Sequence, residues 1–161
     1  MHATHPEPDR LSNSAPANRE PSQDIAVPRE LHIGRHRLLV RADEVLWEVH
    51  GNCDVDELRQ IIALGEELAA RYGRYYSLID GKEGISITPA ARRYNADWER
   101  AHGGSKALTI IFGANALART IVSLVNRAAQ LVLGRSPEVI FVKTEAEARA
   151  TILHDRATRQ R

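Results

Sequence analysis

The order of the expected strands and helices constrains this chain most. Two short apolar runs, residues 37–40 and 45–49, are separated only by a polar break at 42–44. A connection this short joins two strands as an antiparallel hairpin. The later strand runs, at 75–80, 107–112 and 139–142, each follow a helical pattern, and strands joined through helices pair in parallel. The sequence therefore predicts an α/β domain with a mixed five-stranded sheet and the element order ββαβαβαβα.

Residues that favour helix ends mark where the first helices begin and stop. Asp54 is followed three residues later by Glu57, which is the spacing of a capping box. Thr88 stands before Pro89, a pairing that suits an N-cap and the first helical position. Gly73 then ends the first helix. These signals predict two helices that pack on the sheet.

The N-terminal 30 residues differ in composition from the rest. They hold five of the seven prolines among polar residues and carry few large apolar side chains. Such a segment buries too little surface to offset the entropy lost on ordering. We therefore expect a disordered arm over residues 1–30, a folded domain over 31–155, and a basic C-terminal end over 156–161.

Charge and cysteine content exclude several classes of function. The 22 Lys and Arg nearly balance the 21 Asp and Glu, so the charge pattern predicts no nucleic-acid binding. Cys53 is the single cysteine and has no partner for an internal disulfide, which suits a reducing cytoplasm. The N-terminus shows no signal-peptide pattern, and polar residues interrupt the apolar stretch 114–133. We expect a cytoplasmic protein without stable membrane insertion.

The predicted element order over about residues 31–153 resembles that of the STAS domain of bacterial anti-sigma factor antagonists. Leu78, Ile79 and Asp80 at the end of the third predicted strand, and the helix start near Thr88, add to the resemblance. The resemblance implies a cytoplasmic, non-enzymatic regulatory module of bacterial signalling that docks a protein partner, such as a regulator or kinase. It implies no cofactor and no catalytic residues.

In that family a phosphorylatable Ser or Thr often lies where the second helix begins. The antagonists carry it in an Asp-Ser-Ser-Gly motif, whereas residues 84–89 here read Gly-Ile-Ser-Ile-Thr-Pro. By position, Ser86 and Thr88 are the phosphorylation candidates, with an N-cap as the simpler role of Thr88. The docking surface expected from the resemblance is the loop 81–89 with the first turn of the second helix; its charged residues are Asp80, Lys82, Glu83, Arg92 and Arg93.

The third predicted helix has a wider apolar face than one sheet requires. A helix that packs on a sheet needs an apolar stripe of roughly 100°. This excess predicts contact with another helix, a homodimer contact, or a site for a lipid or other apolar ligand. The apolar patch consists of Ile121, Val122, Leu124, Val125, Leu131 and Val132.

A receiver-like phosphoacceptor is a further alternative. Receivers combine an acidic pair, an Asp after the third strand and a Lys after the fifth, and here Asp43 and Glu44, Asp80 and Lys143 are the corresponding residues. Mg²⁺ would bind the acidic groups and the Lys would neutralise the product. The three-residue break at 42–44 leaves no room for the helix that separates the first two strands of a receiver.

Two other features of the sequence contain side chains that can bind metal or act as nucleophiles. His32 and His36 would face the same side of one extended segment and form half a metal site, but no nearby carboxylate or Cys in the sequence completes it. Cys53 precedes a helix without a neighbouring base to activate it, which favours a buried or half-buried thiol. The sequence thus predicts no metal site and no catalytic site.

Overall fold

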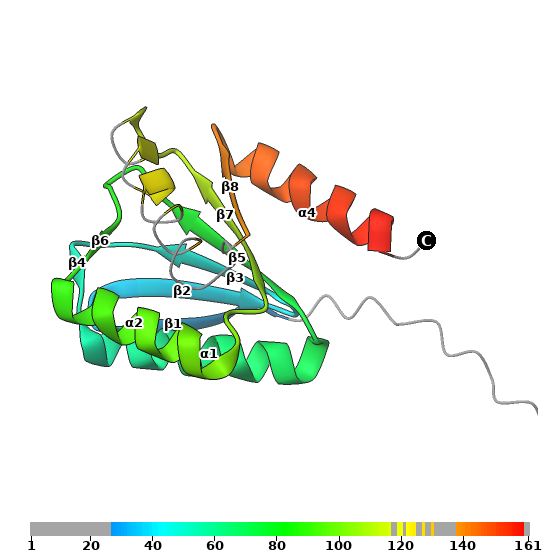
Figure 1. Ribbon diagram of the computed structural model, residues 1–161. Coiled ribbons are helices and arrows are strands. Elements are labelled where there is room, and N and C mark those ends of the chain that lie inside the picture. The colour runs from blue at the N-terminus through cyan, green and yellow to red at the C-terminus, as the bar shows by residue number, and fades with distance from the viewer. Residues whose placement is uncertain are drawn as a thin grey trace, which may run out of the picture.

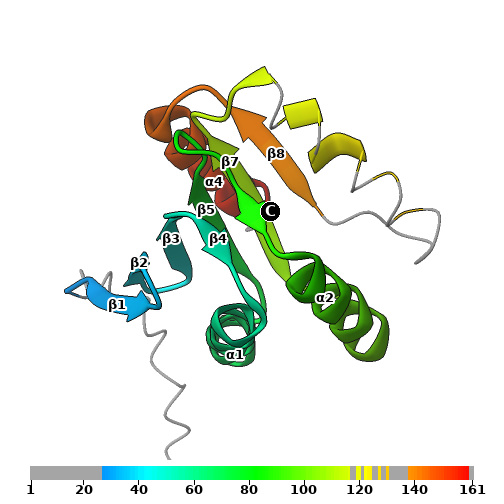
Figure 2. The same cartoon turned by 90° about the vertical axis from the view of Figure 1, so that its left-hand side faces the viewer.

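The computed structural model describes residues 27–116, 119–120, 122–124, 127, 130 and 138–159. A mixed sheet forms the centre of the fold, and helices pack on both of its faces (Figures 1 and 2). The elements are, in chain order, β1 (Arg29–Ile33), β2 (His36–Arg41), β3 (Glu44–Glu48), β4 (Asn52–Cys53), α1 (Val55–Tyr72), β5 (Tyr75–Asp80), β6 (Ser86–Ile87), α2 (Pro89–His102), β7 (Ala107–Phe112), β8 (Val139–Val142) and α4 (Glu145–Arg159). Residues 116, 119–120, 122–124, 127 and 130, between β7 and β8, are also helical.

The main sheet has six strands in the order β1-β2-β3-β5-β7-β8. β1, β2 and β3 pair antiparallel, and β3, β5, β7 and β8 pair in parallel. The α/β class and the mixed sheet are therefore confirmed. The prediction of five strands is wrong, because β1 adds an antiparallel strand at the edge.

β1 and α4 shift two of the predicted boundaries. Arg29 and Glu30, which we assigned to the N-terminal arm, lie in β1, whose short polar sequence directly after Pro28 gave little strand signal. Residues 156–159, assigned to a basic C-terminal end, belong to α4. Of the rest of the predicted arm, residues 27 and 28 are described and exposed, whereas residues 1–26, like the last two residues of the chain, lie outside the described part.

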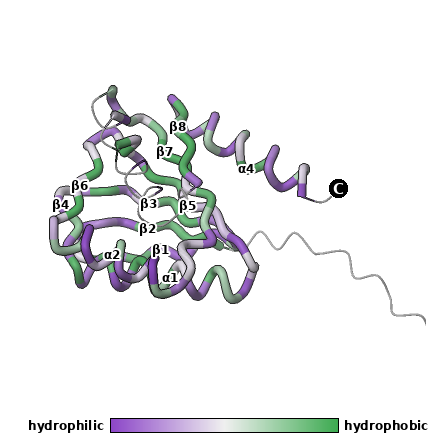
Figure 3. The backbone as a smooth tube through the Cα atoms, in the orientation of Figure 1, coloured by the Kyte–Doolittle hydropathy of each residue, from purple (hydrophilic) through white to green (hydrophobic). Residues whose placement is uncertain are grey.

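The two faces of the sheet carry separate apolar clusters. α1 and α2 cover one face, where Leu38, Trp47 and Ile111 are buried. α4 covers the other face over β5 and β7, where Leu78 and Ile110 are buried. Figure 3 shows the hydrophobic colour gathered along the strands and much hydrophilic colour on α2. In the described part of the chain, no helix is long and apolar enough to span a membrane.

Both predicted N-caps are present. The Asp54 carboxylate accepts hydrogen bonds from the backbone N–H groups of Asp56 and Glu57, both at 2.9 Å, and the Glu57 carboxylate accepts from the N–H of Asp54. The Thr88 hydroxyl accepts from the N–H of Ala91 at 3.2 Å. These bonds satisfy donors that a helix start leaves unpaired, and they fix where α1 and α2 leave the sheet.

Tyr76, near the start of β5, binds α4 to the sheet. Its side chain is 1 % exposed, and its hydroxyl donates to Asp155 at 2.9 Å while accepting from Arg159 at 3.1 Å. The guanidinium groups of Arg156 and Arg159 lie 5.1 and 5.4 Å from the ring centroid, within cation–π range. Burial and the bond to Asp155 raise the pKa of Tyr76 to about 12, so the phenol stays protonated at neutral pH.

Tyr76→Phe tests this anchor. Loss of the hydroxyl leaves a part-buried carboxylate and a guanidinium each without one partner, and we expect the free energy of unfolding to fall by about 1–2 kcal/mol. Tyr72→Phe is the matched control, since Tyr72 is 38 % exposed, and should change stability by under about 0.5 kcal/mol. Urea denaturation measures both values, and equal losses in the two variants would contradict the anchor.

Candidate functional site

The register of the parallel strands brings two loops together at one edge of the sheet. Glu48 at the end of β3 pairs with Asp80 at the end of β5. The chain beyond each strand then forms the short strands β4 and β6, which pair in parallel. The N–H of Thr88 donates to the carbonyl of Cys53 at 3.0 Å and ties the two helix starts together. We call segments 49–54 and 80–88 the carboxyl-edge junction.

His36 lies beneath this junction. β2 runs antiparallel to β3, so its first residue reaches the same edge, and its side chain is fully buried. Nδ1 of the ring accepts the backbone N–H of His50 at 3.1 Å. A neutral imidazole has one donor and one acceptor nitrogen, so the proton of neutral His36 is on Nε2. The hydrogen bond from the His50 N–H thus fixes the tautomer, because it requires an unprotonated Nδ1.

Nε2 of His36 points toward Glu57 and Cys53. The carboxylate oxygen Oε2 of Glu57 lies 3.3 Å from Nε2, but the geometry is not that of a hydrogen bond, and the buried Nε2 has no hydrogen-bond partner. The ligand atoms of His36, Cys53 and Glu57 all lie within 4.8 Å of one another. This arrangement joins a nitrogen, a sulfur and an oxygen donor that together could hold a metal ion.

Cys53 is a free cysteine with a fully buried side chain. Burial, followed by the nearby negative charges of Glu57 and Asp54, raises the pKa of its thiol to about 12. Without a cation it is therefore a neutral thiol at physiological pH, and its sulfur lies 3.6 Å from the carbonyl of Asp54 as a weak donor. This agrees with the expectation of a buried thiol rather than a nucleophile.

Sequence reasoning did not predict the cluster of His36, Cys53 and Glu57. His32 and His36 do not form the half-site that one extended segment would give, because a turn at Gly34 and Arg35 places the two residues on different strands. His32 is exposed beside Glu30. The signal that was present was the capping box, since it fixes the Glu57 side chain next to residue 53.

The loop after β5 is held by its own charged residues. The Asp80 carboxylate accepts the backbone N–H of Lys82 at 3.0 Å and pairs with its ammonium at 3.1 Å. Glu83 pairs with Nδ1 of His50 at 3.0 Å, which links the two loops of the junction. Gly81 is buried, and a Cβ there would stand 3.0 Å from the Cβ of Ala114. The loop therefore follows a defined path over the sheet edge.

The remaining predicted surface residues lie at the start of α2. Ser86 in β6 is exposed, whereas Thr88 is half-buried and acts as the N-cap. Arg92 and Arg93 are exposed, and the first turn of α2 contains no acidic residue. The structure thus brings Asp80, Lys82, Glu83, Ser86, Thr88, Arg92 and Arg93 to one region.

The groups of the receiver-like alternative do not come together. Glu44 pairs in register with Tyr76, four residues before Asp80 on β5, which separates the acidic pair from Asp80 by roughly 13 Å along the strands. Asp43 and Glu44 instead bind Arg156 of α4. Lys143 follows β8 at the same edge as Asp80, but two strand spacings away. Asp43 and Glu44 therefore do not stand beside Asp80, where the acidic pair of a receiver would hold Mg²⁺.

Most of the predicted apolar patch cannot be placed. Ile121, Val125, Leu131 and Val132 lie outside the described residues. Of the other two, Val122 is half-buried and packs against the cluster under α1 and α2, and Leu124 is 60 % exposed. These two residues therefore differ in burial, and the patch as a whole stays a prediction.

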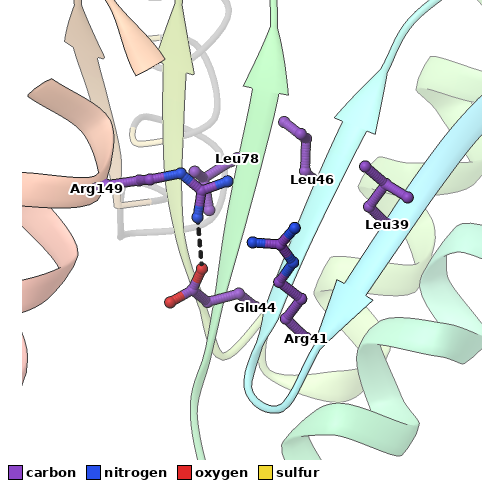
Figure 4. Close-up of a pocket in the computed structure, with 6 residues that line it drawn as sticks. All are labelled: Leu39, Arg41, Glu44, Leu46, Leu78 and Arg149. Atoms are coloured by element: carbon purple, nitrogen blue, oxygen red, sulfur yellow. Dashed lines mark hydrogen bonds and ion pairs between the residues drawn. The ribbon is translucent and has the colours of Figure 1, made fainter. Parts of the chain in front are cut away.

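The other face of the sheet carries a hollow between β2 and α4. Leu39, Leu46 and Leu78 form its floor, and Arg41, Glu44 and Arg149 form its rim, with Arg149 paired to Glu44 at 3.3 Å (Figure 4). Its volume is about 20 Å³, which is room for roughly one water molecule. A lipid or another drug-sized ligand does not fit there.

Comparison of the chain with protein-family models, curated proteins and solved structures found no match.

Gly34→Ala tests the packing of Glu57 against the β1–β2 turn. Gly34 has φ +60°, and a Cβ there would stand 1.7 Å from Oε1 of Glu57. The Glu57 side chain must then shift, which strains its capping bond to Asp54, and together with the left-handed backbone at position 34 we expect a loss of about 2–4 kcal/mol in the free energy of unfolding. Gly103→Ala is the control, because Gly103 has φ +71° and no atom within 4 Å of a Cβ. It should lose only about 1–2 kcal/mol, and equal losses would show that Glu57 is not held there.

Cys53→Ala tests the buried thiol through pH. The folded-state pKa of Cys53 is raised from 9.0 to about 12, so the folded protein keeps a proton that the unfolded chain releases above pH 9. The thiol's contribution to stability is complete below pH 9 and falls as pH rises toward 12, by up to about 1.4 kcal/mol per pH unit. Denaturation in chelator-treated buffer from pH 8 to 11 should show a steeper decline for wild type than for the variant. Parallel curves would contradict a buried neutral thiol.

Proposed function

We propose that this protein is a non-enzymatic regulatory module that docks a protein partner at the carboxyl-edge junction and the first turn of α2. The observation that carries the proposal is the exposed positive charge at this place. Arg92 and Arg93 are exposed near the start of a helix whose first turn has no acidic residue, and Lys82 is exposed on the loop before it. Helix N-termini attract negative charge, so the surface suits an acidic segment of a partner.

The rigidity of the surface supports the same function. Asp80 holds the backbone of Lys82, and Glu83 is tied to the neighbouring loop through His50. A loop held in one conformation loses less entropy when a partner binds. α2 buries only Ala91 completely, which leaves its outer side available for contact. These features are those of a preformed docking site.

The STAS resemblance supports a regulatory role. Helical crossovers follow the β2–β3 hairpin and connect parallel strands, as the element order implied. Under this proposal the protein works in the bacterial cytoplasm, a location that suits its buried free thiol. Ser86 is the better candidate for phosphorylation, because it is exposed while the Thr88 hydroxyl caps α2. A phosphate on Ser86 would reverse the local charge and release an acidic partner.

A photo-crosslinking amino acid tests the docking surface in the organism that makes the protein. Benzoylphenylalanine replaces the exposed Ala90 of α2, or, as a control, the exposed Lys106 at the opposite end of the sheet. We expect a discrete adduct with another protein from position 90 and none from position 106. Arg92→Gln with Arg93→Gln should reduce the adduct about tenfold, since two charged contacts are lost.

A charge-matched pair of substitutions guards against a general effect on solubility. Arg71→Gln with Lys106→Gln removes two exposed positive charges away from the junction and should leave the adduct at wild-type level. Equal adducts from positions 90 and 106, or equal loss in both double variants, would contradict docking at this surface.

A further inference from the structure

We propose that His36, Cys53 and Glu57 form a binding site for a thiophilic divalent cation of the Zn²⁺ class. The three side chains come from β2, β4 and α1, and their ligand atoms lie within 4.8 Å of one another. Imidazole nitrogen, thiolate sulfur and carboxylate oxygen are all ligands that Zn²⁺ takes. The sulfur selects against Mg²⁺ and Ca²⁺, which prefer oxygen.

The spacing of the donors fits a small tetrahedral ion. Zn²⁺ lies about 2.0–2.3 Å from such atoms, so the donor atoms around it are roughly 3.3–3.8 Å apart. The widest pair here therefore needs to close by no more than about 1.5 Å. The Glu57 side chain is 16 % exposed while the other two are buried, so it forms the outer rim where the ion enters and a water completes the coordination.

An unpaired buried atom points to a ligand independently of this spacing. Nε2 of His36 is fully buried and has no hydrogen-bond partner, although it faces a carboxylate and a sulfur. Buried polar atoms without partners are rare and require a cause. A cation between the three side chains gives this nitrogen a partner.

Backbone hydrogen bonds hold two of the three ligands in place. The Asp54 N–H binds the Glu57 carboxylate, and the Thr88 N–H binds the carbonyl of Cys53. Metal sites generally depend on such outer partners to orient their ligands. Glu57 and Cys53 are therefore held by the same bonds that build the carboxyl-edge junction.

Charge and protons balance in the bound state. A divalent cation, one thiolate and one carboxylate sum to zero, which suits a site largely removed from water. The Cys53 thiol releases one proton to solvent when the metal–sulfur bond forms. The Nε2 proton of His36 gives way to the metal–nitrogen bond, Nδ1 takes up a proton, and the His50 N–H loses its acceptor. Binding thus releases one proton per metal ion and leaves the His50 amide without its acceptor.

Co²⁺ is the probe for this site, because a cobalt–thiolate bond absorbs in the near ultraviolet. The full chain, stripped with a chelator, is titrated with Co²⁺ both in the native state and during refolding. We expect a thiolate-to-cobalt band that saturates at one ion per chain, with release of one proton per ion in weakly buffered solution. Hydrogen exchange at the His50 amide should become faster on binding.

Three variants separate this site from adventitious binding. Cys53→Ala should lose the band, and Glu57→Gln, which can still form a capping box, should weaken binding at least about tenfold. His154→Ala removes an exposed histidine of α4 and should bind as wild type does. Circular dichroism verifies that each variant is folded. Absence of the band in both wild-type titrations, or unchanged binding in folded Glu57→Gln, would overturn the proposal.

Discussion

Parallel pairing of β3 with β5 is the constraint on which the rest of this structure depends. The register that places Glu48 beside Asp80 sets the two following loops next to each other, and both lead directly into helices. The antiparallel β2 then delivers His36 to the same edge. The start of β2 and the ends of β3 and β5 therefore meet at one edge of the sheet. The residues proposed for docking and for metal binding lie at this edge or in the segments that follow it.

Two kinds of interaction hold that edge, one buried and one exposed. Beneath it, Nδ1 of the His36 ring accepts the His50 amide, and Cys53 is a neutral thiol when no cation is bound. Above it, Asp80 and Glu83 hold the loop through Lys82 and His50. A buried polar group without a full set of partners costs free energy and selects a ligand of matching geometry. Exposed ion pairs contribute little stability, but exposed charges guide the approach of a partner. The inner layer thus suits a ligand of fixed geometry, and the outer layer suits reversible protein contact.

The sequence predicted the parts of the fold that depend on local pattern. The Asp54–Glu57 capping box and Thr88-Pro89 set the starts of α1 and α2, and apolar runs set five of the strands, because both signals lie within a few residues. β1 was not predicted because a short edge strand buries few apolar side chains, and only Ile33 in it is buried. The cluster around His36 was missed because its members come together through strand pairing, across 21 positions of sequence, and no local signal encodes that contact. The position of the surface charges near α2 could be predicted, because these residues lie close in sequence to the predicted start of the helix.

Native-state hydrogen exchange tests most directly whether the carboxyl-edge junction is one structural unit built on His36. His36→Leu removes the acceptor of the His50 amide, and the Thr88 amide reports on the contact between the loops. Ile110, fully buried in β7, reports on global unfolding. We expect the His50 and Thr88 amides both to lose protection, by at least about tenfold more than the Ile110 amide does. An unchanged Thr88 amide, or the same loss at all three positions, would contradict a junction that depends on His36.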